Sequence, residues 1–269
     1  MFSFFAVSTN TYHDFSLHEA LSGIARAGFR FVEMACVRDW TNHFDFESAS
    51  LADIEELKRL LRSFGLEVVS LSAHSDLASP EGVTYLRKAL RFAKNLGAQV
   101  VNTGTVESVT QKDVLLRHLE VLAHDAEKTE VRIGLEIHGD FLRSGQVASL
   151  LMEEVRSPFV GINYDTGNAV YYGDVRPEED IKACLPHIVH LHLKDKRGGY
   201  KVWDFPPLGE GTVDFPTIFA LLEGAQKDVP LSVEIEFQGR FDHPREFVDE
   251  AVQKSFDYLS RILKGEKNP

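Results

Sequence analysis

Residues 188–195 read IVHLHLKD, an apolar run that carries two histidines and ends in a lysine and an aspartate. Near-continuous apolar runs of this length are typical of strands in a parallel sheet, which is covered on both faces. Comparable runs recur along the chain, at residues 4–9, 29–35, 66–73, 98–104, 133–138, 160–165, 188–193 and 231–237. Between them lie segments with the apolar spacing of helices, and several of these end in glycine, such as residues 16–28 and 50–65.

Strict alternation of strand-like and helix-like segments predicts a parallel sheet wrapped by helices. The repeated right-handed crossovers expected for a chain of 269 residues favour closure into a single (β/α)8 TIM barrel, for which about 250 residues is typical. A doubly wound open sheet is the alternative. No Pro-, Gly- or Ser-rich linker interrupts the sequence, so we expect one domain over residues 1–269 with a polar, frayed tail at 264–269.

Composition and charge narrow the classes of function. The chain carries 29 basic and 41 acidic side chains, a formal net charge of −12. Tight nucleic-acid binding depends on clustered basic groups that neutralise phosphates, so no nucleic-acid partner is expected, although a local basic patch is compatible with this total. The two cysteines, Cys36 and Cys184, lie in apolar contexts, which favours reduced thiols and a cytoplasmic protein. We recognise no export signal and no apolar run long enough for a membrane span, so no membrane partner is expected.

Acidic or imidazole side chains lie near the ends of the last four strand-like runs: Glu136, Asp165, His192 and Glu234. An ionised carboxylate in such a run costs on the order of several kcal/mol unless a partner or a metal compensates it. Buried ion pairs and a hydrogen-bonded core histidine are the structural alternative. Because the strands of a parallel barrel end at one rim, we expect the four side chains to converge there. Three oxygen ligands and one imidazole predict one divalent metal, with Mn²⁺ favoured and Mg²⁺, Co²⁺ or Zn²⁺ as alternatives.

Side-chain alternation leaves the choice of ligand open within each strand. Every second residue of a strand points to the same face. Three groups share a face in this way: Glu136 with His138, His192 with His190 and Lys194, and Glu234 with Glu236. Position along the strand should decide among them, because a metal ligand must lie near the carboxyl end of its strand.

The order of these residues and the words around them, LEIHG, YDTGN, HLHLKD and LGEGTVDFP, resemble the xylose isomerase-like barrel superfamily, in particular its sugar-phosphate isomerase/epimerase branch. The resemblance extends from GFRFVEM at residues 28–34 to the last strand-like run. Members similar to tagatose epimerase, hydroxypyruvate isomerase, inosose dehydratase and dehydroshikimate dehydratase bind one divalent metal through a Glu, Asp, His, Glu set. The resemblance therefore implies metal ligation by Glu136, Asp165, His192 and Glu234. It also implies a small sugar or cyclitol substrate and a homodimer or homotetramer.

The resemblance implies a reaction as well. A metal chelated by a carbonyl and its neighbouring hydroxyl acidifies the C–H between them, and Glu136 and Glu234 would then transfer the proton through an enediolate. Isomerisation or epimerisation is the leading hypothesis. His138 stands where some dehydratases carry a histidine base, so it is the third candidate catalytic residue, with a polar rim residue as its structural reading, and dehydration is the alternative reaction. Ketose epimerases carry a histidine at the position of Asn168 and a glutamate at that of Leu142, so substrate contacts should differ.

Further residues are candidates for substrate binding: His74, Lys194, Arg197, Trp40 and Trp203. His74 follows the third strand-like run and could reach a substrate hydroxyl or cap a turn. Lys194 and Arg197 could bind a carboxylate, a phosphate or hydroxyl groups, or form a solvated basic loop. The two tryptophans could form an apolar wall. Glu33 could orient a ligand or pair with a core base.

Two other functions are disfavoured. An endonuclease IV-like nuclease would share the barrel and part of the ligand set, but it needs extra histidines for a three-metal cluster. The fourth strand-like run, VVNTGT at residues 100–105, and the loop WDFPPLGEG at residues 203–211 contain none. A non-catalytic barrel that binds a metabolite would have no need of a buried charged cluster.

Overall fold

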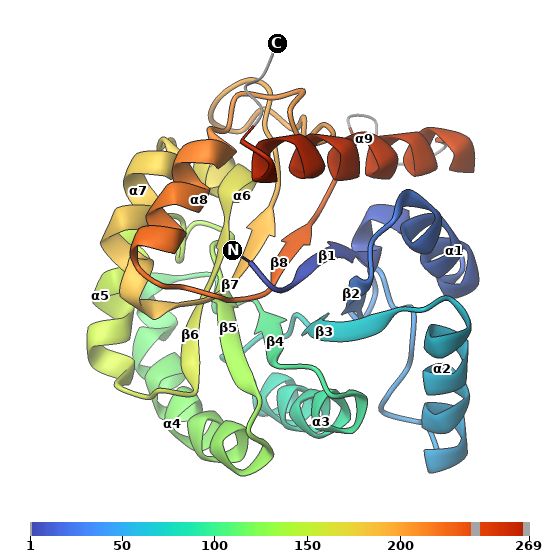
Figure 1. Ribbon diagram of the computed structural model, residues 1–269. Helices are drawn as coiled ribbons and strands as arrows, with labels where there is room; N and C mark the ends of the chain where they lie inside the picture. Colours follow the sequence, from blue (N-terminus) through green and yellow to red (C-terminus); the bar gives the residue numbers. More distant parts are fainter. Residues whose placement is uncertain (1, 238–242, 266–269) are drawn as a thin grey trace.

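The computed structural model describes residues 2–237 and 243–265. Within these residues, eight parallel strands close into one barrel in chain order, and the first strand pairs with the last (Figure 1). The strands are β1 (Phe5–Ser8), β2 (Phe31–Ala35), β3 (Glu67–Ser72), β4 (Val100–Thr103), β5 (Arg132–Glu136), β6 (Val160–Asp165), β7 (Ile188–Leu193) and β8 (Leu231–Val233). This closure confirms the predicted TIM barrel and excludes the doubly wound open sheet.

Helices form the outer layer around the strands (Figure 1). The α-helices are α1 (Leu17–Ala27), α2 (Leu51–Ser63), α3 (Pro80–Leu96), α4 (Lys112–Thr129), α5 (Gly145–Val155), α6 (Thr166–Gly173), α7 (Pro177–Cys184), α8 (Phe215–Gly224) and α9 (Arg245–Leu263). Short 3₁₀ helices are η1 (Thr9–Tyr12), η2 (Val109–Gln111) and η3 (Leu185–His187). Local sequence sets several of the boundaries, since α1 begins with a capping box between Ser16 and Glu19 and ends at Gly28 in the left-handed conformation.

The end of the last strand differs from the sequence-based expectation. The last strand-like run, residues 231–237, was expected to be one strand, but β8 ends at Val233. Val233 pairs with the last residue of β7 and with Val7, one residue before the end of β1, so β8 ends where its two neighbours end. Beyond it, Glu236 forms only an isolated antiparallel bridge with Phe205 among the described residues. Most of the predicted polar tail lies outside the described residues. No helix among the described residues is both long and apolar enough to span a membrane.

The inside of the barrel contains a polar layer, made by side chains that six strands direct inward and that are fully buried: Glu33, Ser70, Asn102, Asn163, His190 and Ser232. Asn163 Oδ1 lies 2.8 Å from His190 Nδ1, and Ser232 Oγ lies 2.9 Å from His190 Nε2. Because buried polar groups are costly unless they are hydrogen-bonded, these contacts make the layer compatible with a stable core. The polar layer lies directly below the carboxyl ends of the strands and supports the site there.

Candidate metal centre and active site

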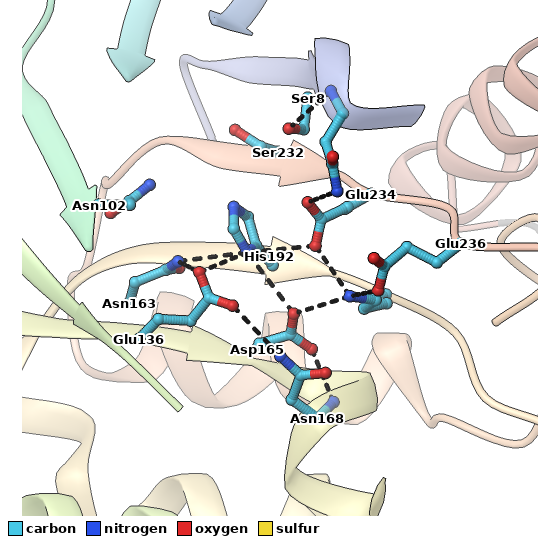
Figure 2. Close-up of polar contacts among 12 residues, drawn as sticks. Ser8, Asn102, Glu136, Asn163, Asp165, Asn168, His192, Ser232, Glu234 and Glu236 are labelled. Atoms are coloured by element: carbon cyan, nitrogen blue, oxygen red, sulfur yellow. Dashed lines mark hydrogen bonds and ion pairs between the residues drawn. The ribbon is translucent and has the colours of Figure 1, made fainter. Parts of the chain in front are cut away.

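Four side chains at the carboxyl end of the barrel point toward one another (Figure 2). Glu136 and Asp165 are the last residues of β5 and β6, His192 lies one residue before the end of β7, and Glu234 follows β8. Nδ1 of His192 lies 3.3 Å from Glu136 Oε2, 3.5 Å from Asp165 Oδ2 and 3.6 Å from Glu234 Oε2. All four residues are buried. The structure thus brings together the four side chains predicted as metal ligands.

Glu33 on β2 sets the orientation of the His192 ring. His192 Nε2 lies 2.7 Å from Glu33 Oε1, and because a carboxylate only accepts hydrogen bonds, this nitrogen carries the proton. Nδ1 is therefore the atom directed at the other carboxylates. Ser70 and Asn102 donate to the second oxygen of Glu33 at 3.0 and 2.6 Å. A hydrogen-bonded carboxylate that fixes a ligand histidine is typical of metal sites.

Asp165 provides the test of whether these residues fit a metal. Its Oδ1 accepts a hydrogen bond from the backbone N–H of Asn168 at 2.7 Å and so caps α6. Its Oδ2 is buried and accepts no hydrogen bond from the described residues, although the His192 ring and Lys194 lie within 3.6 Å. A buried carboxylate oxygen without a hydrogen bond is costly. A cation bound beside it would satisfy it, so the donor set fits a divalent metal.

Lys194 supplies a positive charge to this cluster. Its ammonium lies 2.9 Å from Glu234 Oε2, pairs closely with Glu236, and is almost fully buried. Burial opposes its charge, but the carboxylates around it, Asp165 first and then Glu234 and Glu236, outweigh burial and raise the pKa of Lys194 well above its usual range. Both glutamates pair with Lys194, but of the two only Glu234 also lies beside Nδ1 of His192, at 3.6 Å, which favours Glu234 as the metal ligand.

Burial disfavours the charged forms of Glu136, Asp165 and His192, and the charges around each side chain decide whether its pKa is raised or lowered. At Glu136, the nearby His74 and His192 outweigh burial and hold its pKa well below the usual range. At His192, the surrounding carboxylates, Glu33 foremost, overcome burial and raise its pKa well above the usual range. Burial prevails at Asp165, whose pKa is raised. Glu136 therefore favours the ionised form, whereas Asp165 and His192 retain their protons more readily, so metal binding at this cluster would be coupled to proton release.

A cavity of about 260 Å³ opens beside this cluster, and of the four predicted metal ligands Glu136 and Glu234 line it. Its lining residues are Asn10, Val37, Trp40, Ser72, His74, Glu136, His138, Asn168, Tyr172, Lys194, Trp203, Glu234 and Glu236. The structure thus places the predicted substrate-binding residues Trp40, His74, Lys194 and Trp203 around the centre. Asn10 and Tyr172 also line it, and the sequence analysis missed both. Asn10 directly follows the first strand-like run, residues 4–9, and this position at a strand end is the signal by which the sequence could have indicated it.

His74 and His138 occupy one side of the cavity. His74 Nε2 lies 3.0 Å from Glu136 Oε2, so His74 holds a ligand carboxylate in addition to facing the cavity. Burial lowers the pKa of His138 to about 4, so this imidazole is neutral near pH 7. Tyr172 Oη lies 3.3 Å from His138 Nε2.

Arg197 lies apart from the other candidates for substrate binding. It is not among the described residues that line the cavity. Its guanidinium donates to the Glu210 carboxylate at 2.7 Å and to the Glu210 backbone carbonyl at 2.9 Å. Arg197 thus joins two parts of the loop between β7 and α8.

Comparisons with known proteins identify the family to which this barrel belongs. The family model described as xylose isomerase-like TIM barrel matches residues 21–261. The chain belongs to this family. An L-ribulose-5-phosphate 3-epimerase of Shigella flexneri serotype 5b is 28% identical over 236 residues, covering 77% of this chain and 78% of that protein.

The fold of this chain is similar to those of two solved structures, among others. D-allulose 3-epimerase from Methylomonas sp., in complex with D-allulose, has a TM-score of 0.75 at 19% identity and covers 95% of this chain and 96% of its own. A xylose isomerase-like TIM barrel protein from Mycobacterium smegmatis, in complex with magnesium, has a TM-score of 0.76 at 18% identity and covers 95% and 98%. At these identities the two structures establish the shared fold alone.

The two sequence departures of this xylose isomerase-like barrel have visible consequences. The side-chain amide of Asn168 donates to Glu136 Oε1 at 3.2 Å. Asn168 stands at the position for which the family resemblance implies a histidine in ketose epimerases. Leu142 is buried, and its carbonyl accepts the backbone N–H of His138 at 2.9 Å. Asn168 therefore acts on a ligand carboxylate, and Leu142 fixes the loop that presents His138.

Proposed function

We propose that the protein is a divalent-metal-dependent epimerase or isomerase of a small ketose. The observation that carries this proposal is the convergence of three buried carboxylates on Nδ1 of His192. The names of the relatives support epimerisation in particular, and the family resemblance supports a cytoplasmic homodimer or homotetramer.

Glu136, Asp165, His192 and Glu234 would hold the metal, with Mn²⁺ favoured. When bound, the metal supplies Lewis acidity that polarises the substrate carbonyl and acidifies the adjacent C–H. The orphaned oxygen of Asp165 and the fixed ring of His192 support this assignment.

Glu136 and Glu234 are the proposed proton-transfer groups. They come from β5 and from the end of β8, so they approach the cavity from different strands of the barrel. His74 and Asn168 fix the Glu136 carboxylate, and a positioned carboxylate contributes about 10² to 10⁴ in rate as a general acid or base. One glutamate removes the proton from carbon and the other returns a proton. Return to the opposite face of the same carbon inverts the centre, whereas return to the neighbouring carbon of the enediolate gives isomerisation.

The cavity supports a small polyhydroxylated substrate. Trp40 and Trp203 provide apolar surface of the kind that lies against a sugar ring, and Lys194 and His138 provide polar groups for hydroxyls. A volume of about 260 Å³ is close to the lower limit of about 300 Å³ typical of small-molecule sites.

The test is carbon-bound hydrogen exchange. Protein loaded with MnCl₂ is incubated in D₂O with a panel of ketopentoses, ketohexoses and their phosphates. We expect deuterium at C3 of at least one ketose, together with its C3 epimer, detected by NMR. Absence of exchange with every ketose, with about one metal bound per chain, would contradict the proposal.

Dehydration is the second candidate, supported by the neutral His138 in the cavity beside Glu136. If His138 is the base of an elimination, His138→Asn should lower the rate by roughly 10² or more. If the glutamate pair carries the reaction, the same variant should keep nearly normal turnover. Rates of exchange and of product formation distinguish the two outcomes.

A further inference from the structure

Asn10 joins one of the proposed ligands to the wall of the cavity. It lies in η1, directly after β1, where Ser8 caps the turn by accepting the backbone N–H of Asn10. Its side-chain Nδ2 donates to Glu234 Oε1 at 3.0 Å. Its Oδ1 accepts hydrogen bonds from Trp40 Nε1 at 3.0 Å and from Thr41 Oγ1 at 2.6 Å. One amide therefore connects three chain segments that are distant in sequence.

The chemistry of the partners fixes which way this amide points. The indole N–H of Trp40 can only donate, so it requires the oxygen of Asn10. The Glu234 carboxylate can only accept when ionised, so it requires the nitrogen. Both requirements agree with one orientation of Asn10. The opposite orientation would break both hydrogen bonds, so the arrangement is determined by the partners and not by Asn10 alone.

The two oxygens of Glu234 have different tasks as a result. Oε1 accepts the hydrogen bond from Asn10, while Oε2 lies beside Lys194 and His192. Figure 2 shows Glu234 directed at His192. Fixing one oxygen fixes the direction of the other. The same amide also accepts the indole N–H of Trp40. The orientation of the Glu234 carboxylate therefore depends on the position of the Trp40 ring.

We infer that Asn10 is a positioning residue that couples the tryptophan wall at Trp40 to the Glu234 carboxylate. A substrate that packs against Trp40 without moving it would then keep the Glu234 carboxylate directed at the proposed metal site. A substrate that displaces Trp40 would change the orientation of this carboxylate. The site thereby distinguishes substrates by their fit to the wall as well as by their reacting carbon. This inference rests on the proposed function, because it takes Glu234 to be a metal ligand and proton-transfer group.

The test is a double-mutant cycle on Mn²⁺ affinity, measured by titration calorimetry of the full chain with MnCl₂. Trp40→Phe removes the indole N–H but keeps an aromatic ring. We expect Asn10→Ala to weaken Mn²⁺ binding by about tenfold or more, as for partners of metal ligands in general. We expect Trp40→Phe to weaken it by a few-fold, although Trp40 is not one of the four ligands. In the double variant, Trp40→Phe should add nothing to Asn10→Ala, since the shared contact is already lost.

The matched control is Trp203→Phe, the same change at the other tryptophan of the cavity, whose ring packs against Tyr171 and Phe205. It should leave Mn²⁺ affinity unchanged alone and in the Asn10→Ala background. Circular dichroism checks that each variant is folded, and Trp40→Phe alone tests the coupling if Asn10→Ala does not fold. Unchanged Mn²⁺ affinity in Trp40→Phe, or additive losses in the double variant, would overturn the inference. Wild-type protein that binds no Mn²⁺ would instead overturn the metal centre, and with it this inference.

Discussion

Glu136→Gln is expected to lose both bound metal and turnover. The substitution replaces a carboxylate that approaches the His192 ring at 3.3 Å and that is also a proposed proton-transfer group. Loss of a general base alone costs about 10² to 10⁴ in rate, so the combined loss in kcat should be roughly 10³ or more. Elemental analysis should fall from about one metal per chain to a small fraction, and His192→Ala should have the same effect on metal content.

Glu236→Gln is the matched control for this prediction. Glu236 is a neighbouring carboxylate that lines the same cavity and, like Glu234, pairs with Lys194, but it is not one of the three carboxylates beside Nδ1 of His192. Its replacement should leave the metal bound, whereas Glu234→Gln should not. If Glu236→Gln loses the metal and Glu234→Gln keeps it, the fourth ligand has been assigned to the wrong glutamate.

Glu33→Ala should have the largest effect on stability. Glu33 is fully buried, receives the Nε2–H of His192, and accepts hydrogen bonds from Ser70 and Asn102. Removing one member of a buried charged network leaves its partners uncompensated, which typically costs about 3 to 5 kcal/mol. Urea unfolding of the metal-free protein should show this as a lower free energy of unfolding. Mn²⁺ affinity should fall as well, because the His192 ring loses its orientation.

Glu55→Ala provides the comparison for that experiment. Glu55 pairs with Lys58 on the exposed face of α2, and exposed pairs of this kind contribute little. The unfolding midpoint should therefore stay at the wild-type value. A Glu33→Ala protein that unfolds at that same midpoint would show that the polar layer inside the barrel does not depend on this carboxylate.

The barrel and the four converging side chains could be predicted because their signals are local. Each strand-like run is recognisable from its own residues, and the βα alternation then dictates that the runs end at one rim. Glu136 and Asp165 are the last residues of their strands and His192 is the second-last of β7, close to the strand ends that the sequence predicts.

The roles of Lys194 and Arg197 could not be separated in the same way. Both belong to one basic segment, LKDKRGG, and both were candidates to bind substrate. Lys194 meets Glu234 and Glu236 from β8 and its extension, whereas Arg197 meets Glu210 of its own loop. These partners are set by tertiary packing. Asn10 was missed for the same reason, since a single amide has no pattern until its partners are known.

The buried ammonium of Lys194 bears on how the protein survives before it meets a metal. Carboxylates gathered at one point repel each other unless a positive charge lies among them. Lys194 provides that charge from within the chain, between Glu234 and Glu236, so we expect the metal-free protein to stay folded. A divalent metal would then bind beside the Lys194 ammonium, at carboxylates that this ammonium already holds together. Loading and unloading can follow the supply of free ions without a cycle of unfolding.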